Sequence, residues 1–171
     1  MYEYIPPQNV KKVMSAVGVS VLGGGALLAV TALLPRVAFR WIFQLIAVAL
    51  FALGIYLYSA YVARRFCYRI ESSANGSLDL CVDELRAKGR VTVCRIAVSG
   101  ISRVDVIERG DKEKKDRLKR QIREEKRKQF GYCAELLPEK TCCLLALECG
   151  ESLAVTLSYD ERLVELLRGN V

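Results

Sequence analysis

The chain contains no histidine, and this absence removes several kinds of site at once. Ser–His and Cys–His catalysis needs an imidazole as general base, and most zinc sites include a histidine ligand. The phosphate-binding pattern G-x-x-x-x-G-K-[ST], the dinucleotide pattern G-x-G-x-x-G and the hydrolase pattern G-x-S-x-G are missing as well. We therefore predict that the protein is not an enzyme and holds neither a cofactor nor a metal.

Regular cysteine spacing is also lacking. The seven cysteines are an odd number without the pattern of a secreted disulfide framework, which favours reduced thiols in the cytosol. The C-x2-4-C pairs of structural zinc sites do not occur. Adjacent Cys142 and Cys143 would point to opposite faces of a strand, so each is predicted to pack as a small hydrophobic residue.

Charged residues are absent from two long stretches, residues 13–34 and 41–63. Each stretch exceeds the roughly 20 residues that a helix needs to cross about 30 Å of hydrocarbon. The first is too long for the core of a signal peptide, and the second follows after only six residues. We therefore predict two uncleaved transmembrane helices that form a hairpin.

Basic residues flank the hairpin unevenly. The connection between the predicted helices has two, Arg36 and Arg40, whereas the outer ends have five. Because cytoplasmic flanks carry the excess of Lys and Arg, we predict a multi-pass protein of the inner (plasma) membrane with both termini in the cytoplasm. Residues 1–12 are then a cytoplasmic segment. The five outer residues are Lys11, Lys12, Arg64, Arg65 and Arg69.

Small residues recur every fourth position in the first predicted helix, at Ala16, Ser20 and Gly24. Such a stripe lets two helix backbones approach closely within lipid. It predicts either packing against the second helix of the hairpin or a homodimer interface. Neither helix has a charge in its middle, which argues against a channel or carrier.

The region after Arg64 reads as a small α+β domain, residues 64–171. Runs rich in β-branched and aromatic residues predict six strands, and a Ser158–Glu161 capping box predicts a final helix with an apolar stripe. We expect the last three strands to form an antiparallel meander and the helix to cover the sheet. The predicted strands are 66–71, 78–82, 90–98, 132–137, 141–148 and 152–157, and the stripe is Leu163, Leu166 and Leu167.

The order FCYRIE, LDLCVDEL, RVTVCRIAVSGISRVDVIE, further strands and a capped helix resembles a bacterial pleckstrin-homology-like (PH-like) domain. Many such domains stand behind a two-helix membrane anchor, in proteins of uncharacterised function. The resemblance covers roughly residues 66–168 together with the anchor. It implies an antiparallel β domain with a C-terminal helix. This chain departs from the family pattern by inserting a charged run within the domain.

That run, residues 111–128, contains ten Lys or Arg and five Asp or Glu, and so holds +5 of the chain's net charge of +7. Its composition predicts a helix, on which only Leu118 and Ile122 form an apolar spot. A stripe this narrow does not insert into a bilayer. Nor are aromatic residues interleaved for stacking on single-stranded nucleic acid, which argues against that partner.

Three interpretations of the charged helix stay open: a solvated arm docked through Leu118 and Ile122, a contact with anionic lipid headgroups, and a contact with nucleic acid or with an acidic protein partner, such as a membrane protein. Two functions follow. One is a non-catalytic binding or scaffolding domain displayed on the bilayer. The other is a membrane-surface sensor that binds anionic lipid or a small ligand through the basic helix. The candidate contact residues are Lys115, Lys119, Arg120, Arg123, Lys126 and Arg127.

Overall fold

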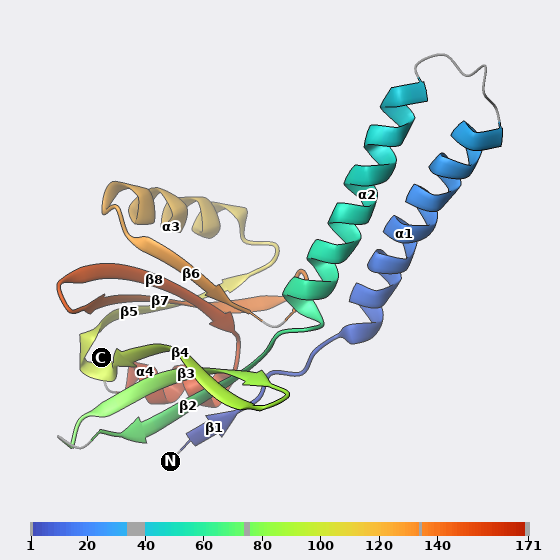
Figure 1. Cartoon of the computed structure of the whole chain (residues 1–171). Helices are drawn as coiled ribbons and strands as arrows, with labels where there is room; N and C mark the ends of the chain where they lie inside the picture. Colours follow the sequence, from blue (N-terminus) through green and yellow to red (C-terminus); the bar gives the residue numbers. More distant parts are fainter. Residues whose placement is uncertain (1, 34–39, 74–75, 134, 170–171) are drawn as a thin grey trace. The chain divides into compact units, whose positions relative to one another are not determined.

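The computed structural model describes residues 2–33, 40–73, 76–133 and 135–169 (Figure 1). The chain divides into two compact units. One unit is the helical segment from Gln8 to Arg64, and the other joins the start of the chain, up to Pro7, with everything from Arg65 onward. The predicted order of two apolar helices, a β-rich region and a final helix is confirmed.

The helical unit consists of α1 (Val10–Leu33) and α2 (Arg40–Tyr61). Both helices are long and apolar enough to span a membrane. Only 17% and 11% of their most apolar windows are buried, so neither is the core helix of a water-soluble bundle. Helix α1 begins three residues before the predicted span and includes Lys11 and Lys12. The predicted connection, apart from Arg40, lies outside the described residues.

The first sheet, sheet A, has the strand order β1-β2-β3-β4 and is antiparallel throughout. Its strands are β1 (Tyr2–Tyr4), β2 (Arg65–Ser72), β3 (Leu78–Arg86) and β4 (Gly89–Ala97). Residues 1–12, predicted as a separate segment without a strand, contain β1. A three-residue strand has too few positions to show a period of two, and β1 forms because β2 pairs with it.

The second sheet, sheet B, follows a single turn of 3-10 helix, η1 (Val98–Gly100), and has the order β5-β7-β8-β6. Within it, β5 pairs with β7 and β7 with β8 in antiparallel fashion, but β6 pairs with β8 in parallel. The predicted antiparallel meander was therefore wrong for its first strand. The strands are β5 (Ile101–Glu108), β6 (Lys128–Tyr132), β7 (Lys140–Glu148) and β8 (Glu151–Ser158).

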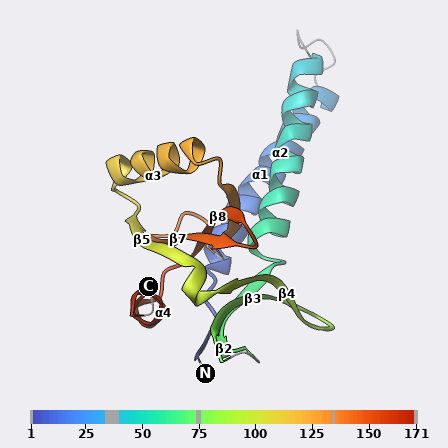
Figure 2. The ribbon, with the colours of Figure 1, turned by 90° about the vertical axis from the view of Figure 1, so that its left-hand side faces the viewer.

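This topology explains the charged insertion. Strand β6 runs parallel to β5, because both run parallel to β8, and parallel strands of one sheet need a crossover connection. Helix α3 (Lys112–Glu124) is that connection. It carries the chain across β7 and β8 to the opposite edge of sheet B, which places it on the outer face of the sheet (Figures 1 and 2). The charged insertion thus forms the crossover of a β5–α3–β6 unit. Its helix has 13 residues, whereas the charged run has 18.

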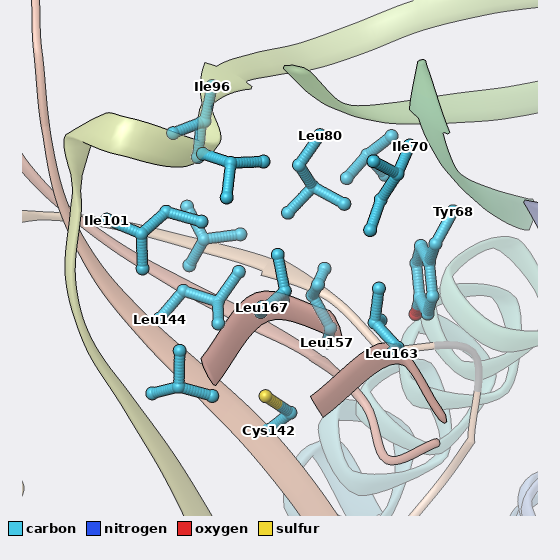
Figure 3. Close-up of a cluster of buried hydrophobic side chains, with 14 of the residues drawn as sticks. Tyr68, Ile70, Leu80, Ile96, Ile101, Cys142, Leu144, Leu157, Leu163 and Leu167 are labelled. Atoms are coloured by element: carbon cyan, nitrogen blue, oxygen red, sulfur yellow. The ribbon is translucent and has the colours of Figure 1, made fainter. Parts of the chain in front are cut away.

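Helix α4 (Glu161–Arg168) ends the fold and covers one side of the core between the sheets. Leu163 and Leu167 are fully buried among side chains of both sheets, such as Leu80 and Leu144, and Figure 3 shows them pointing into this core. Leu166 was predicted to belong to the same buried stripe, but it is exposed, and Val164 is buried instead.

The predicted capping box at the start of α4 was wrong. Ser158 belongs to β8, and the residue that caps the helix is Asp160, whose side chain accepts a hydrogen bond of 2.9 Å from the backbone N–H of Leu163. Asp is as good an N-cap as Ser, and Asp160 has the extended backbone that the cap position needs. The strand simply continues further than local sequence signals indicate.

Candidate binding surface on the charged helix

The ends of α3 are closed by local hydrogen bonds. The side chain of Asp111 accepts from the backbone N–H of Lys114 at 2.9 Å and so caps the N-terminus. At the other end, the N–H of Arg127 bonds to the carbonyl of Ile122 at 3.0 Å, while Lys126 takes a left-handed conformation with φ of 50°. This is a Schellman-type end with lysine where glycine is usual.

The inner side of α3 packs on sheet B through two residues. Leu118 and Ile122 are 7% and 6% exposed, and they contact an apolar patch on the outer face of the sheet. The contact residues of the patch are Cys143, Leu145 and Ala154, with Ile107 at its margin. Helix α3 is therefore docked on the sheet and does not stand free in solvent.

Hydrogen bonds from basic side chains connect both ends of α3 to backbone carbonyls of sheet B. The ammonium group of Lys114 donates to the carbonyl of Val106 at 2.7 Å. Beyond the C-terminal end, the guanidinium of Arg127 donates to the carbonyls of Ala146 and Leu153 at 3.1 and 3.3 Å, and it pairs with Glu125. Arg127, a predicted partner contact, is only 13% exposed and serves the fold instead.

One flank of α3 carries charges of both signs. A shallow groove there is lined by Glu113, Arg117, Gln121 and neighbouring side chains, and Arg117 pairs with Glu113 at 3.3 Å. Arg120, another predicted contact, also lines this groove, together with Asp116 and Glu124. We call this side the mixed flank.

The opposite flank carries only cations. Residues at successive spacings of three, four and four lie on one side of a helix, and on α3 these residues are all basic and all exposed. Within the described ranges of the chain, no carboxylate forms an ion pair with any of them. Exposed Lys126 follows just beyond the helix end. We call this side the basic flank; it consists of Lys112, Lys115, Lys119 and Arg123.

Between α3 and β5 lies a second groove, with a volume of about 310 Å³. Its charges are already matched: Arg103 lies 2.7 Å from the carboxylate of Asp105 and also donates to Gln121 at 3.3 Å. Lys114, on the same wall, is held by the carbonyl of Val106. These contacts hold the helix against the sheet.

Two acidic residues of β3, Asp79 and Asp83, lie on the outer face of sheet A. Asp83, 1% exposed, lies 3.3 Å from Arg69 and accepts a hydrogen bond of 2.7 Å from Thr92. Asp79 pairs with Arg95 at 2.7 Å. Each carboxylate is occupied by a neighbour one strand away, so the cluster is a cross-strand ion-pair ladder without a free acid–base pair.

The buried cysteines are packing residues, whereas Cys149 is exposed. Cys142 belongs to the core between the sheets, and Cys143 to the patch under α3, which is the opposite-face arrangement that their adjacency predicts. Burial raises the pKa of Cys142 to about 12, and burial together with a hydrogen bond to Glu3 raises the pKa of Cys67 to about 11. Thiols held in the neutral form are poor nucleophiles and poor metal ligands. In the part of the chain that the structure describes, no three metal-ligating side chains converge.

The small-residue stripe of α1 lies against α2. Ser20 and Gly24 are buried, and Ala16, half-buried, accepts the hydroxyl hydrogen bond of Ser20 at 3.0 Å. A Cβ atom added to Gly24 would stand 3.1 Å from the carbonyl oxygen of Ala47, so the backbones are in close contact there. A Cβ atom added to Gly54 of α2 would stand 3.6 Å from the Cβ of Ser20, which is an ordinary packing distance. Within the hairpin, this stripe is the packing seam.

Comparison of the chain with protein-family models, with curated proteins and with solved structures gave no match.

Proposed function

We propose that the protein is a multi-pass inner-membrane protein whose two-helix anchor displays a non-catalytic binding or scaffolding domain in the cytoplasm. The observation that carries this proposal is the exposure of the two long apolar helices. Large side chains such as Leu22, Leu33 and Ile55 are 70–79% exposed on them, and only lipid makes so large an apolar surface stable.

The pairing of β1 with β2 supports the predicted topology. These strands lie before α1 and after α2 in the sequence, and residues that pair in one sheet must lie on the same side of a membrane. An even number of spans meets this requirement. The excess of basic residues at the outer ends of the hairpin then favours the cytoplasm for both termini.

Two observations support a binding role over catalysis. The carboxylates on sheet A are engaged in ion pairs, and the pKa values of four buried thiols, Cys67, Cys81, Cys142 and Cys143, are raised. In contrast, α3 presents a row of cations that the rest of the described domain does not use.

A PH-like identity for the domain is part of this proposal. Its support is the order of the elements: the antiparallel strands β2, β3 and β4, then a second sheet, then a final helix that packs on residues of both sheets. The β5–α3–β6 crossover is an addition to that order. It covers the outer face of sheet B and adds a parallel strand to one edge.

Membrane fractionation with topology reporters tests the proposal. We expect the full chain to resist extraction by alkaline carbonate, and reporters fused to either end to be active only in the cytoplasm. A variant with arginines in place of Leu22 and Ile55 should lose insertion, whereas alanines there should preserve it. Release of the unaltered chain by carbonate would refute the anchor. A C-terminal reporter that is active outside the cell would refute the orientation.

A further inference from the structure

The basic flank of α3 is a continuous row of four cations. Lys112 and Arg123 mark its ends, eleven residues apart, so the row is roughly 16 Å long at 1.5 Å per residue. The two grooves beside α3 are lined by other residues of the helix, so the basic flank lies away from both of them. It is therefore a distinct surface, separate from the charges that hold α3 on sheet B.

In the described part of the domain no ion pair neutralises this row, and the nearest carboxylate along the helix is Asp116, four residues after Lys112 and three before Lys119. Like charges four residues apart repel, and the flank contains two such pairs, Lys115 with Lys119 and Lys119 with Arg123. The mixed flank of the same helix avoids that repulsion by placing Glu113 four residues before Arg117. Like charges four residues apart on one side of a helix, next to opposite charges at the same spacing on the other side, are typical of a functional surface.

The row is also held rigidly. Leu118 and Ile122 fix the inner side of the helix, while Lys114 and Arg127 fasten its two ends to backbone carbonyls of sheet B. A partner therefore meets cations whose backbone is already ordered, and binding costs mainly side-chain entropy.

We propose that the basic flank binds anionic lipid headgroups of the bilayer that holds α1 and α2. This inference rests on the membrane anchor proposed above and names the ligand of the displayed domain. Charge complementarity selects a polyanionic surface, and the tether keeps lipid phosphates at a high local concentration. The flank has no apolar residue to insert among acyl chains and no aromatic residue to stack on bases, so the contact is purely electrostatic.

The test measures lysine reactivity in the full chain, reconstituted in nanodiscs of phosphatidylcholine alone or with about one-third phosphatidylglycerol. Amines held against lipid phosphates are acylated slowly by a water-soluble ester, and mass spectrometry reads each lysine separately. We expect anionic lipid to slow acylation of Lys112, Lys115 and Lys119 about fivefold at roughly 0.1 M salt, and the protection to vanish near 1 M, where screening is nearly complete. Lys128 of β6, which pairs with Glu151 of β8, is the internal control, and its acylation rate should not change.

Two double variants separate the flanks. Lys115→Gln with Lys119→Gln should abolish the protection of Lys112. Arg117→Gln with Arg120→Gln, which removes the same number of charges from the mixed flank, should preserve it. All four residues are exposed, so neither variant disturbs the core.

Equal acylation rates in the two kinds of nanodisc would overturn the proposal. So would protection by short duplex DNA in phosphatidylcholine discs without protection by phosphatidylglycerol, since the ligand would then be nucleic acid. Either result leaves the anchor intact, because carbonate extraction tests the anchor independently.

Discussion

The two sheets of the β domain treat their outer faces in opposite ways. The outer face of sheet A carries cross-strand ion pairs, Asp83 with Arg69 and Asp79 with Arg95. Sheet B faces outward with an apolar patch around Cys143 and needs a helix to cover it. Both solutions remove the same hazard, since an uncovered apolar sheet face would aggregate.

The difference shows what the charged insertion is for. A strongly hydrophilic run looks like an addition to a finished domain, yet two apolar residues are enough to make it a structural layer. The layers are α3, sheet B, the core and sheet A, and α4 covers one open side of the core (Figure 2). Because α3 uses only one narrow side for packing, its remaining sides are free to carry charge.

The largest expected effect comes from uncovering sheet B. Leu118→Ala and Ile122→Ala should each lower the free energy of unfolding by about 2–4 kcal/mol, the usual cost of truncating a buried aliphatic side chain. Urea unfolding of the detergent-solubilised chain, followed by alkylation of Cys143, measures this directly. Arg120→Ala, on the exposed side, should change the stability by less than about 0.5 kcal/mol. An equal effect of all three variants would show that α3 is not a cover.

Breaking the ladder on sheet A should have a somewhat smaller effect. Asp83→Ala leaves Thr92 without its acceptor and Arg69 with Glu71 as its remaining ion-pair partner, and we expect a loss of about 2–3 kcal/mol. Asp83→Asn keeps an acceptor for Thr92 and should cost less. The exposed pair of Glu113 with Arg117 is the control, for which Glu113→Gln should cost at most about 1 kcal/mol. Thermal unfolding followed by circular dichroism ranks the three variants, and a neutral Asp83→Ala would contradict the proposed ladder.

The N-terminal edge of sheet A provides a third, weaker test. The hydroxyl of Tyr2 donates to Asp160, the residue that caps α4, so β1 and α4 share one carboxylate. Tyr2→Phe should cost about 1 kcal/mol, the net value of one hydrogen bond. Asp160→Ala removes the cap as well and should cost about 1–2 kcal/mol. Hydrogen exchange of the first turn of α4 should quicken in both variants; unchanged exchange in Tyr2→Phe would show that β1 is independent of α4.

The last expected effect is absent at neutral pH. Burial holds the pKa values of Cys67 and Cys81 at about 11, with hydrogen bonds to Glu3 and Glu71 acting in the same direction. An unfolded thiol ionises near pH 9, so the unfolded state loses protons first. The contribution of these two thiols to the stability should therefore be constant below about pH 9, and the stability should fall between about pH 9 and 11. Urea midpoints across this range test the sign. Cys67→Ser and Cys81→Ser should flatten the fall, and a stability that rises with pH would refute it.

Parts of this fold and of the candidate surface follow from local sequence. The two uncharged stretches became α1 and α2 within a few residues of the predicted bounds, because the absence of charge over 20 residues is unambiguous. The predicted strands near residues 66, 78, 90, 141 and 152 also exist. Leu118 and Ile122 stood out as the only apolar pair in the charged run, and they are the residues that dock it.

Other features depend on partners far away in the sequence. Strand β1 exists because β2 offers it an edge more than 60 residues later, and β6 lies beside β8 because the crossover places it there. Arg127 looked like any other cation of the run until the β7–β8 pair supplied two carbonyls for it. Lys126 lies beyond the helix because the backbone needs a left-handed residue at that point.

By itself, the sequence determined the two apolar helices, the β-rich character of the rest and the concentration of positive charge between residues 111 and 128. These properties depend on composition and on periods of two or 3.6 residues, which each segment carries alone. Only the tertiary structure decided that the charged run covers sheet B, and that its cations divide into a structural Arg127, a mixed flank and a basic flank. The division depends on which side of α3 packs on sheet B. Local sequence does not show this, because sheet B is assembled from segments both before and after α3 in the sequence.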